Sequence, residues 1–533
     1  MQTTSSLARR LTLAVAAPVL AFLTLAAWSI SSPVGSSPDD DFHLSSTWCG
    51  LGERPGLCEN VDGDSAARSV PKALTNAACF AQKSNETAAC WSDPNDSTMT
   101  NTLRVNSTGL YPPVFYATMA LFASSDIQTS VLIMRLLNSA FAVSLITLVF
   151  FALPRWMRPA LIISVAATVV PLGLFILASI NPSSWAILSA ATVWICLYGA
   201  TQTDGRRRFL LSALAIFAAV IGAGARADSA MYSLFSVALA AILGLRLRRD
   251  QTIPIASAIV VCAISLVFYL SAWQGASVFT GMVDGNPPLT RAQHAQNLLN
   301  IPSLWSGALG GWGLGWLDTP LPPFVSFLSL AVFSGAIFLG LKSAGPRRLI
   351  ATSLAFLAMW VVPFVLLARS NVLVGEAVQP RYILPLLTIA VGVASVQRGV
   401  EFLWSGAPAA FASVFLAVAA SIALHTNIQR YTTGIDQLHL DPGSNAVWWW
   451  TNAPSPLATW IFGSVAFTGM FAALWFVLRR ETGSRRNDKV PRAEGPSQLH
   501  EPEPNEPQAT TSSGSGVEVA DVSTGQSRTI WKS

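Results

Sequence analysis

Long apolar runs are the feature that most constrains what this chain can fold into. An α-helix needs about 20 mainly apolar residues to cross the hydrocarbon core of a bilayer, and such runs recur from near the N-terminus to residue 478. Only 11% of the residues are charged, against roughly a quarter in soluble proteins. The sequence therefore predicts an all-α integral membrane protein with about twelve transmembrane helices. We place them at residues 11–30, 130–153, 160–179, 185–200, 210–225, 229–245, 252–271, 323–341, 349–368, 382–397, 407–424 and 456–478.

Basic residues between the apolar runs predict the orientation of the chain. Alternate turns carry arginine clusters, such as Arg206 to Arg208, while the turns between them carry few basic residues. Because cytoplasmic loops are enriched in lysine and arginine, the clustered turns are predicted to be cytoplasmic, with the N-terminal residues 1–10 and the tail 479–533. The polar composition of the tail is typical of disorder. The net charge of +5 arises from these clusters and does not indicate nucleic-acid binding.

The first external loop is large and holds four of the six cysteines. It spans residues 31–129, and its end is predicted to form an interfacial helix that begins with two prolines. Further external loops are expected near 272–322, 369–381 and 425–455. An even set of cysteines in a loop indicates disulfides and an oxidising compartment. Three pairings are possible, and we favour Cys49–Cys58 and Cys79–Cys90 because these close short loops.

Three carboxylates and an imidazole follow the first apolar run, in the stretch Ser37-Pro38-Asp39-Asp40-Asp41-Phe42-His43. Asp40 or Asp41 could accept the proton of an acceptor hydroxyl, with His43 in support. The same three side chains are candidate ligands of Mg²⁺ or Mn²⁺, which prefer hard oxygen donors. The alternative is a solvated acidic loop without chemistry.

Polar groups at the external helix ends are candidates for substrate binding. Arginine can hold a phosphate through two hydrogen bonds, and the phosphate of a lipid-linked donor lies at about this depth. Alternatively, Arg135 extends to the interface and Arg226 forms an ion pair with Asp228. The candidates are Arg135 with Asn138 on the same helical face, Arg226, Asp318 in a glycine- and tryptophan-rich loop, Arg369 and Arg381.

The order of these features resembles the start of GT-C type glycosyltransferases, which are polytopic enzymes that use polyprenyl-phosphate sugars. The pieces are the acidic loop, YPPVFY at 111–116, and the helix that opens with MRLLNSAFA at 134–142. The resemblance implies a GT-C-like arrangement of helices. It also implies that Asp40 or Asp41, Tyr111 with Pro113, and Arg135 lie at the substrate site.

The chain is also similar to domain-of-unknown-function family 2142, a family of bacterial membrane proteins. This resemblance implies a location in the bacterial plasma membrane and no particular substrate. The matching pieces are SPDDDFH at 37–43, YPPVFY at 111–116, NPSSW at 181–185, GWLDTP at 315–320 and QPRYILPL at 379–386.

These features together predict a cell-envelope glycosyltransferase that moves a hexosyl or pentosyl group. Its expected partners are membrane lipid, a polyprenyl-phosphate sugar donor and an extracytoplasmic glycan or protein acceptor. A transporter or flippase of a lipid-linked precursor is the alternative, and it would require ionisable residues in the middle of helices, where this chain has almost none. A third hypothesis is a non-catalytic membrane scaffold.

Overall fold

The structure is a computed structural model. It describes residues 2–244, 246, 248–276, 280–283, 285–404, 406–437, 439–450 and 452–487. The chain divides into two units, Met1–Arg485 and Arg486–Ser533. Part of the predicted tail is helical, because the last helix runs on to Asn487. The rest of that tail lies outside the described residues.

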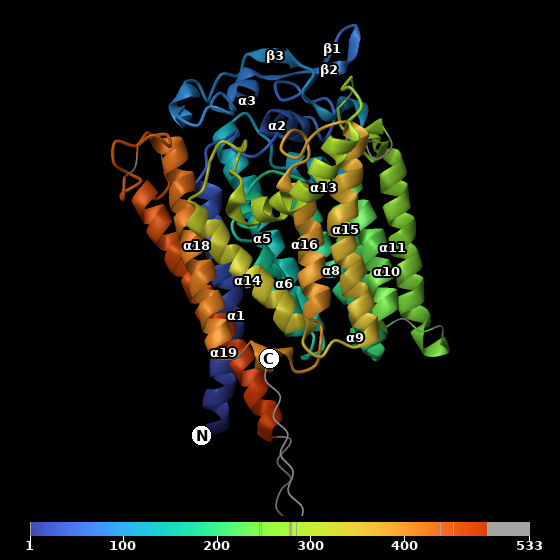
Figure 1. Ribbon diagram of the computed structural model, residues 1–533. Coiled ribbons are helices and arrows are strands. Elements are labelled where there is room, and N and C mark those ends of the chain that lie inside the picture. Colours follow the sequence, from blue (N-terminus) through green and yellow to red (C-terminus); the bar gives the residue numbers. More distant parts are fainter. Residues whose placement is uncertain are drawn as a thin grey trace, which may run out of the picture. The chain divides into compact units, whose positions relative to one another are not determined.

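Most of the described chain is helical, and the long helices run roughly side by side (Figure 1). Within the described residues, nine helices are long and apolar enough to cross a membrane, and three further apolar segments are shorter. Each predicted apolar run coincides with one of these segments, while the number that crosses the membrane stays a prediction. The longer helices are α5 (Ile127–Ala152), α8 (Ser183–Thr201), α9 (Gly205–Ala225), α10 (Ala227–Gly244), α11 (Thr252–Ser271), α14 (Pro323–Leu341), α15 (Pro346–Ser370), α18 (Ala407–Thr432) and α19 (Pro456–Asn487). The shorter segments belong to α1 (Gln2–Ile30), α6 (Arg158–Thr168) and α16 (Pro380–Ser395).

The predicted continuous helix at 160–179 is wrong. The structure has two helices there, α6 and α7 (Leu172–Leu177). Pro171 lies between them, and proline both lacks a backbone N–H and disfavours helical geometry in the residue before it. The chain therefore breaks in the middle of the apolar run.

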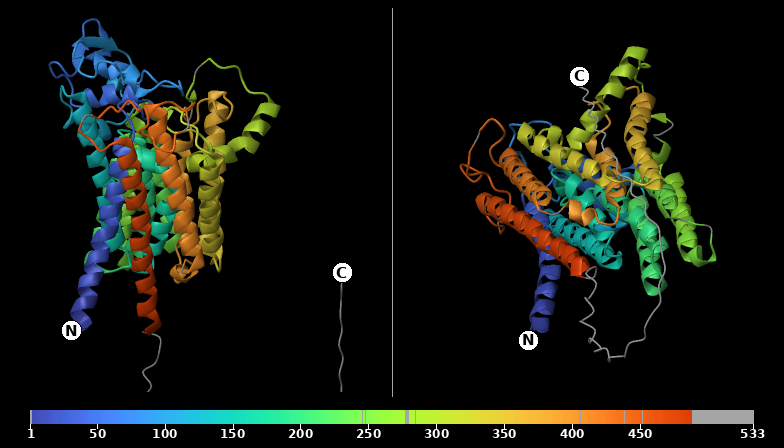
Figure 2. Two further views of the ribbon diagram at one scale, coloured as in Figure 1. Left: turned by 90° about the vertical axis from the view of Figure 1, so that its left-hand side faces the viewer. Right: turned by 60° about the horizontal axis from the view of Figure 1, so that its bottom comes forward.

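The prediction of an all-α fold is wrong in the first loop, which contains a small antiparallel sheet. Its strands are β1 (Glu59–Val61), β2 (Asp64–Pro71) and β3 (Met99–Thr102), in the order β1-β2-β3. With α2 (Asp40–Trp48) and α3 (Lys72–Asn76), the sheet covers one end of the helices (Figures 1 and 2). We call this end the loop face and define it by residues 31–113.

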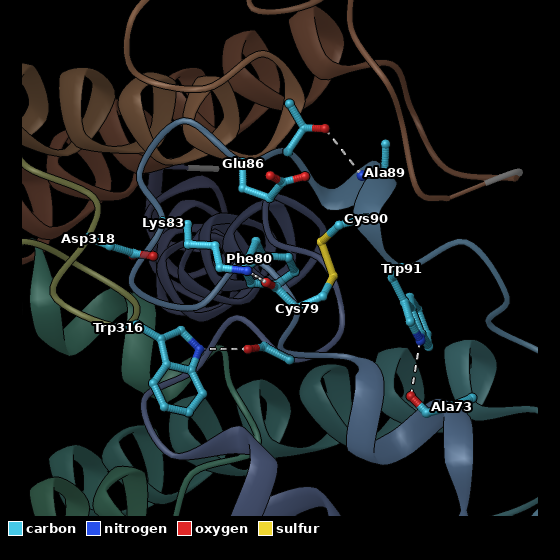
Figure 3. The surroundings of a disulfide bond; sticks show 12 residues. Ala73, Cys79, Phe80, Lys83, Glu86, Ala89, Cys90, Trp91, Trp316 and Asp318 are labelled. Carbon is cyan, nitrogen blue, oxygen red and sulfur yellow. Dashed lines mark hydrogen bonds between the residues drawn. A yellow bond between two sulfur atoms is a disulfide. The ribbon is translucent and has the colours of Figure 1, made fainter.

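Both favoured disulfide pairings are confirmed. Cys49 is bonded to Cys58, and Cys79 to Cys90. The second bond closes a short loop that lies beside Trp316 and Asp318 of a distant segment (Figure 3). This contact joins the loop face to the segment before α14, because Trp316 donates to the main-chain oxygen of Gly35 over 2.9 Å and Asp318 accepts from the backbone N–H of Gln82 over 3.1 Å.

Two predicted external loops contain more helix than expected. Residues 272–322 include α13 (Arg291–Ser306), whose first turn has a capping box formed by Thr290 and Gln293. Helix α18 continues to Thr432, so the start of the predicted loop 425–455 is helical. The extra turns of α18 carry Arg430, which reaches the first loop.

Helix α4 (Val114–Ala120) occupies the place of the predicted interfacial helix, but its aromatic residues point inward. Phe115 and Tyr116 are buried. The helix packs against α2 and α9, because the loop face covers it. Its aromatic side chains therefore help to build the interior beneath the loop face.

Candidate functional site

The candidate site is centred on the start of α2 at the loop face. Asp39 precedes this helix with left-handed backbone angles, φ 60° and ψ 26°, which aspartate tolerates better than most residues. Its main-chain oxygen accepts hydrogen bonds from the N–H groups of Phe42 and His43. The charge of Asp39 acts on His43, so the two side chains lie close together at the helix start, whereas the charge that acts most strongly on Asp40 is that of Arg135.

Asp39 forms an ion pair with Arg381, the second residue of α16. The Arg381 side chain is 2% exposed and that of Asp39 is 31% exposed. Nη2 of Arg381 also donates to the hydroxyl of Tyr382 over 3.1 Å. Burial raises the pKa of the Asp39 carboxyl, but the charge and hydrogen bond of Arg381, with further contributions from His43 and Arg104, together outweigh burial, and the net pKa lies below its usual range. Asp39 is therefore ionised at neutral pH.

Arg226 supplies a second buried guanidinium at the junction of α9 and α10. It forms the expected ion pair with Asp228, with 2.9 Å from Nε to Oδ1 and 2.6 Å from Nη2 to Oδ2. Its guanidinium carbon lies 5.5 Å from the ring centre of Tyr111 and 5.0 Å from that of Tyr382. The guanidinium carbon of Arg381 is also 5.0 Å from the Tyr382 ring. Two arginines, one between α9 and α10 and one from α16, thus meet at one aromatic side chain.

His43 adds a neutral imidazole to this cluster. Its Nδ1 lies 2.8 Å from the hydroxyl of Tyr116, and its ring is fully buried. Burial lowers the pKa of His43 to about 3, and the positive charges of Arg381 and Arg226 add to this effect against the opposing charge of Asp39.

Asp41 and Arg104 form the rim of the site. Nε and Nη2 of Arg104 donate to the two carboxylate oxygens of Asp41 over 2.7 and 3.0 Å. The Arg104 side chain is 57% exposed, so this pair faces solvent, unlike the two buried arginines.

Several buried nitrogen atoms of the site have no hydrogen-bond partner in the described part of the chain. They are Nε and Nη1 of Arg381, Nη1 of Arg226 and Nε2 of His43. Leaving a buried polar group unpaired costs about 1–3 kcal/mol, and more for a charged group. A ligand with several acceptor oxygens would satisfy the unpaired guanidinium N–H groups, so the cluster has the chemistry of an anion site.

Asp40 lies outside this cluster. It is 1% exposed, and its Oδ2 accepts from the backbone N–H of Ser37 over 3.0 Å. Burial raises the pKa of its carboxyl to about 7, against the opposing charge of Arg135. Asp40, Asp41 and His43 therefore face different partners. Within the described residues, no group of three His, Cys, Asp or Glu side chains is placed to share a metal ion, so these candidate metal ligands do not converge.

Arg135 and Asn138 are buried on one face of α5, as expected, but they bind the chain itself. The terminal nitrogens of Arg135 donate to main-chain oxygens of Ser29, in the last turn of α1, and of Ser32 and Pro33, just past its end. The amide of Asn138 donates to the main-chain oxygens of Leu177, at the end of α7, and Ser179, and it accepts from the indole of Trp185. Both side chains hold the turns beneath the loop face, and their predicted contact with substrate stays a prediction.

The other predicted substrate contacts are divided between the site and its surroundings. Tyr111 lies at Arg226, while Pro113 is exposed at the start of α4. Asp318 is buried in an ion pair with Arg430, 2.9 Å apart, and so anchors the first loop. Arg369 is exposed at the end of α15. The structure therefore brings Arg226, Arg381 and Tyr111 together and leaves these others apart.

Sequence reasoning did not single out Asp39, Arg104 or Tyr382. Asp39 was one of three consecutive aspartates, and only its four-residue spacing from His43 could have favoured it. Arg104 lies in a polar loop and has no local pattern. Tyr382 follows Arg381 directly, but its contact with Arg226 depends on the packing of α16 near α10.

Residues 22–390 match the family described as "Predicted membrane protein (DUF2142)". The chain has no significant match among curated proteins. The family match covers more than half of the chain and includes α2, Arg226 and Arg381. The helices of membrane-spanning length agree with the description of the family. This integral membrane protein therefore belongs to the DUF2142 family.

Proposed function

We propose that the protein is a GT-C-like glycosyltransferase that moves a sugar from a polyprenyl-phosphate donor to an extracytoplasmic glycan or protein acceptor. The observation that carries the proposal is the pair of buried arginines, Arg226 and Arg381, with unpaired N–H groups beside the carboxylate of Asp39.

A phosphate supplies what these arginines lack. Hydrogen bonds between guanidinium and phosphate are charge-assisted and strong, and burial strengthens them because the surrounding dielectric constant is low. Both arginines lie where apolar helices end, at the loop face. The headgroup region of a bilayer lies just beyond its hydrocarbon core, so a lipid phosphate would meet the site at this level.

The reaction joins the acceptor to the sugar and frees the lipid phosphate. The acceptor oxygen forms a bond to the anomeric carbon while the bond from that carbon to the phosphate oxygen breaks. The electron pair leaves with the phosphate, and Arg226 and Arg381 stabilise the added negative charge. The proton of the acceptor hydroxyl passes to a carboxylate at the start of α2. The loop face would then lie outside the bacterial plasma membrane, with both termini in the cytoplasm.

The test uses the full-length protein in detergent and a panel of polyprenyl-phosphate sugars. Because a ligand stabilises the state that binds it, a true donor should raise the thermal midpoint and yield a glycosylated acceptor. Arg226→Lys and Arg381→Lys keep the charge but lose the planar fork, and each should weaken donor binding about tenfold, or ~1.4 kcal/mol. Arg291→Ala removes an exposed arginine at the start of α13 and serves as the control.

Two results would contradict the proposal. If no donor stabilised the folded protein, the arginines would not form a lipid-phosphate site. If a donor bound and no acceptor received sugar, transport of a lipid-linked precursor would become the better hypothesis.

A further inference from the structure

Asp39 occupies the same arginine that the donor phosphate is proposed to bind. Its carboxylate pairs with Nη2 of Arg381, while Nε and Nη1 of that guanidinium have no partner. The Asp39 carboxylate is therefore an anion of the protein itself that occupies one nitrogen of Arg381 and leaves the other two without an acceptor.

We infer that Asp39 is the general base of the proposed reaction, and that the resting protein holds it on Arg381 until the phosphate of the donor displaces it. This inference rests on the proposed function. It adds two claims, which are that one named carboxylate accepts the proton and that the same carboxylate competes with the substrate for Arg381.

The backbone allows this exchange with little rearrangement. The main-chain oxygen of Asp39 accepts from the N–H groups of Phe42 and His43 over 3.0 and 2.8 Å, which fixes the start of α2 independently of the side chain. The side chain of Asp39 is 31% exposed, so it has solvent beside it. Rotation about its first side-chain bond therefore moves the carboxylate away from Arg381 while the helix start stays in place.

The charges favour displacement by phosphate. A carboxylate offers Arg381 two oxygens, whereas a phosphate that bridges Arg381 and Arg226 also satisfies donors that Asp39 leaves open. The released carboxylate stays near Arg104 at the rim, whose positive charge already acts on it. Binding of the donor thus frees the base only when there is a donor to attack.

The neighbouring aspartates do not fit this role. Asp40 is buried, and Arg135 is the positive charge that acts on it. Asp41 is held at the rim by two hydrogen bonds to Arg104. Of the three aspartates, Asp39 is the one that contacts Arg381, a residue proposed to bind the phosphate.

The proton moves without any added reactant. As the acceptor oxygen bonds to the anomeric carbon, its proton passes to the freed carboxylate of Asp39. The bond between the anomeric carbon and the phosphate oxygen breaks. The electron pair stays on the phosphate, whose negative charge the two arginines stabilise. The protonated Asp39 loses its proton to solvent before the ion pair with Arg381 forms again.

The experiment measures phosphate binding separately from sugar transfer. The affinity of the full-length protein for inorganic phosphate and for a short-chain isoprenyl phosphate is compared with that of Asp39→Asn. Removing the competitor should tighten binding about tenfold, while transfer falls at least about a hundredfold. Asp39→Gly is the second variant, because glycine adopts left-handed backbone angles freely. Like Asp39→Asn, it should bind phosphate more tightly and transfer less sugar. Asp62→Asn, which removes an exposed carboxylate in the turn between β1 and β2, is the matched control and should leave phosphate affinity unchanged.

The outcomes separate the two levels of the proposal. Unchanged or weaker phosphate affinity in both folded Asp39 variants would overturn the claim that Asp39 competes with phosphate for Arg381, even if the wild-type protein transfers sugar. Tighter binding with full transfer would overturn Asp39 as the base. Tighter binding in a protein that transfers sugar from no donor would support the competition at Arg381 and defeat the proposed function.

Discussion

Asp40 and His43 are single residues of α2 whose burial links the stability of the protein to pH. The pKa of Asp40 is about 7 in the folded protein, above its ordinary value of 3.8. Between these values the folded state binds more protons than the unfolded state, so stability falls as pH rises from about 4 to about 7. Asp40→Asn removes this loss and should raise the thermal midpoint at pH 8 but not at pH 4. Asp41→Asn is the control, and an unchanged midpoint for Asp40→Asn at pH 8 would contradict the prediction.

The burial of His43 acts in the opposite direction. Its pKa is about 3 in the folded protein and 6.5 ordinarily. Its contribution is fully present above about pH 6.5 and is lost as pH falls toward about 3, because the unfolded state takes up the proton first. His43→Gln should therefore flatten the fall of the thermal midpoint between pH 6.5 and pH 4. A variant that loses stability as steeply as wild type would show that other groups cause the fall.

At the residue scale, the sequence predicts which charged residues form the site better than it predicts which residues they contact. The acidic stretch at 37–43 and the arginines Arg226 and Arg381 were found because charges beside apolar runs are rare. The ion pair between Asp39 and Arg381 joins residues 342 positions apart, and no local pattern encodes that pairing. Arg135 was predicted to bind substrate, but its contacts are with main-chain oxygens. A buried arginine has the same sequence pattern whether it binds a ligand or a main-chain turn.

At the scale of elements, Arg430 of α18 connects the disulfide loop to the helices. It is fully buried, donates to the main-chain oxygens of Phe80 and Lys83, and pairs with Asp318. Arg430→Gln would leave Asp318 as a buried unpaired charge, which typically costs about 3–5 kcal/mol. We expect faster hydrogen exchange in residues 79–90 and a lower thermal midpoint.

The matched control removes both charges. Asp318→Asn with Arg430→Gln leaves no uncompensated buried ion, so part of the lost stability should return. If the double variant were as unstable as the two single losses added together, the ion pair would not be the connection between these elements.

Element boundaries show where sequence patterns stop being informative. The apolar runs coincide with helices because length and hydropathy are local properties. The break at Pro171 could have been predicted, since proline in an apolar run interrupts helical hydrogen bonds. The extension of α18 to Thr432 could not, because its last turns carry polar residues such as Arg430 that are buried by contact with a distant loop.

At the scale of the whole molecule, the charge pattern predicts one orientation of the loop face. Arg206 to Arg208 lie at the start of α9, whereas the other end of α9 is followed by Arg226 of the candidate site. Because cytoplasmic turns retain arginine clusters, the loop face should lie outside the cytoplasm. That side is also the one on which the disulfides Cys49–Cys58 and Cys79–Cys90 would persist.

Single cysteines test this orientation in intact cells. Ser65→Cys places a thiol at the exposed start of β2, and Gln202→Cys places one in the exposed turn between α8 and α9, both in a Cys262→Ala background. A thiol reagent that cannot cross membranes should label Ser65→Cys in intact cells and Gln202→Cys only after permeabilisation. The reverse pattern would place the loop face in the cytoplasm. An extracytoplasmic acceptor could then not reach the start of α2, so the orientation decides which acceptors the proposed transferase can use.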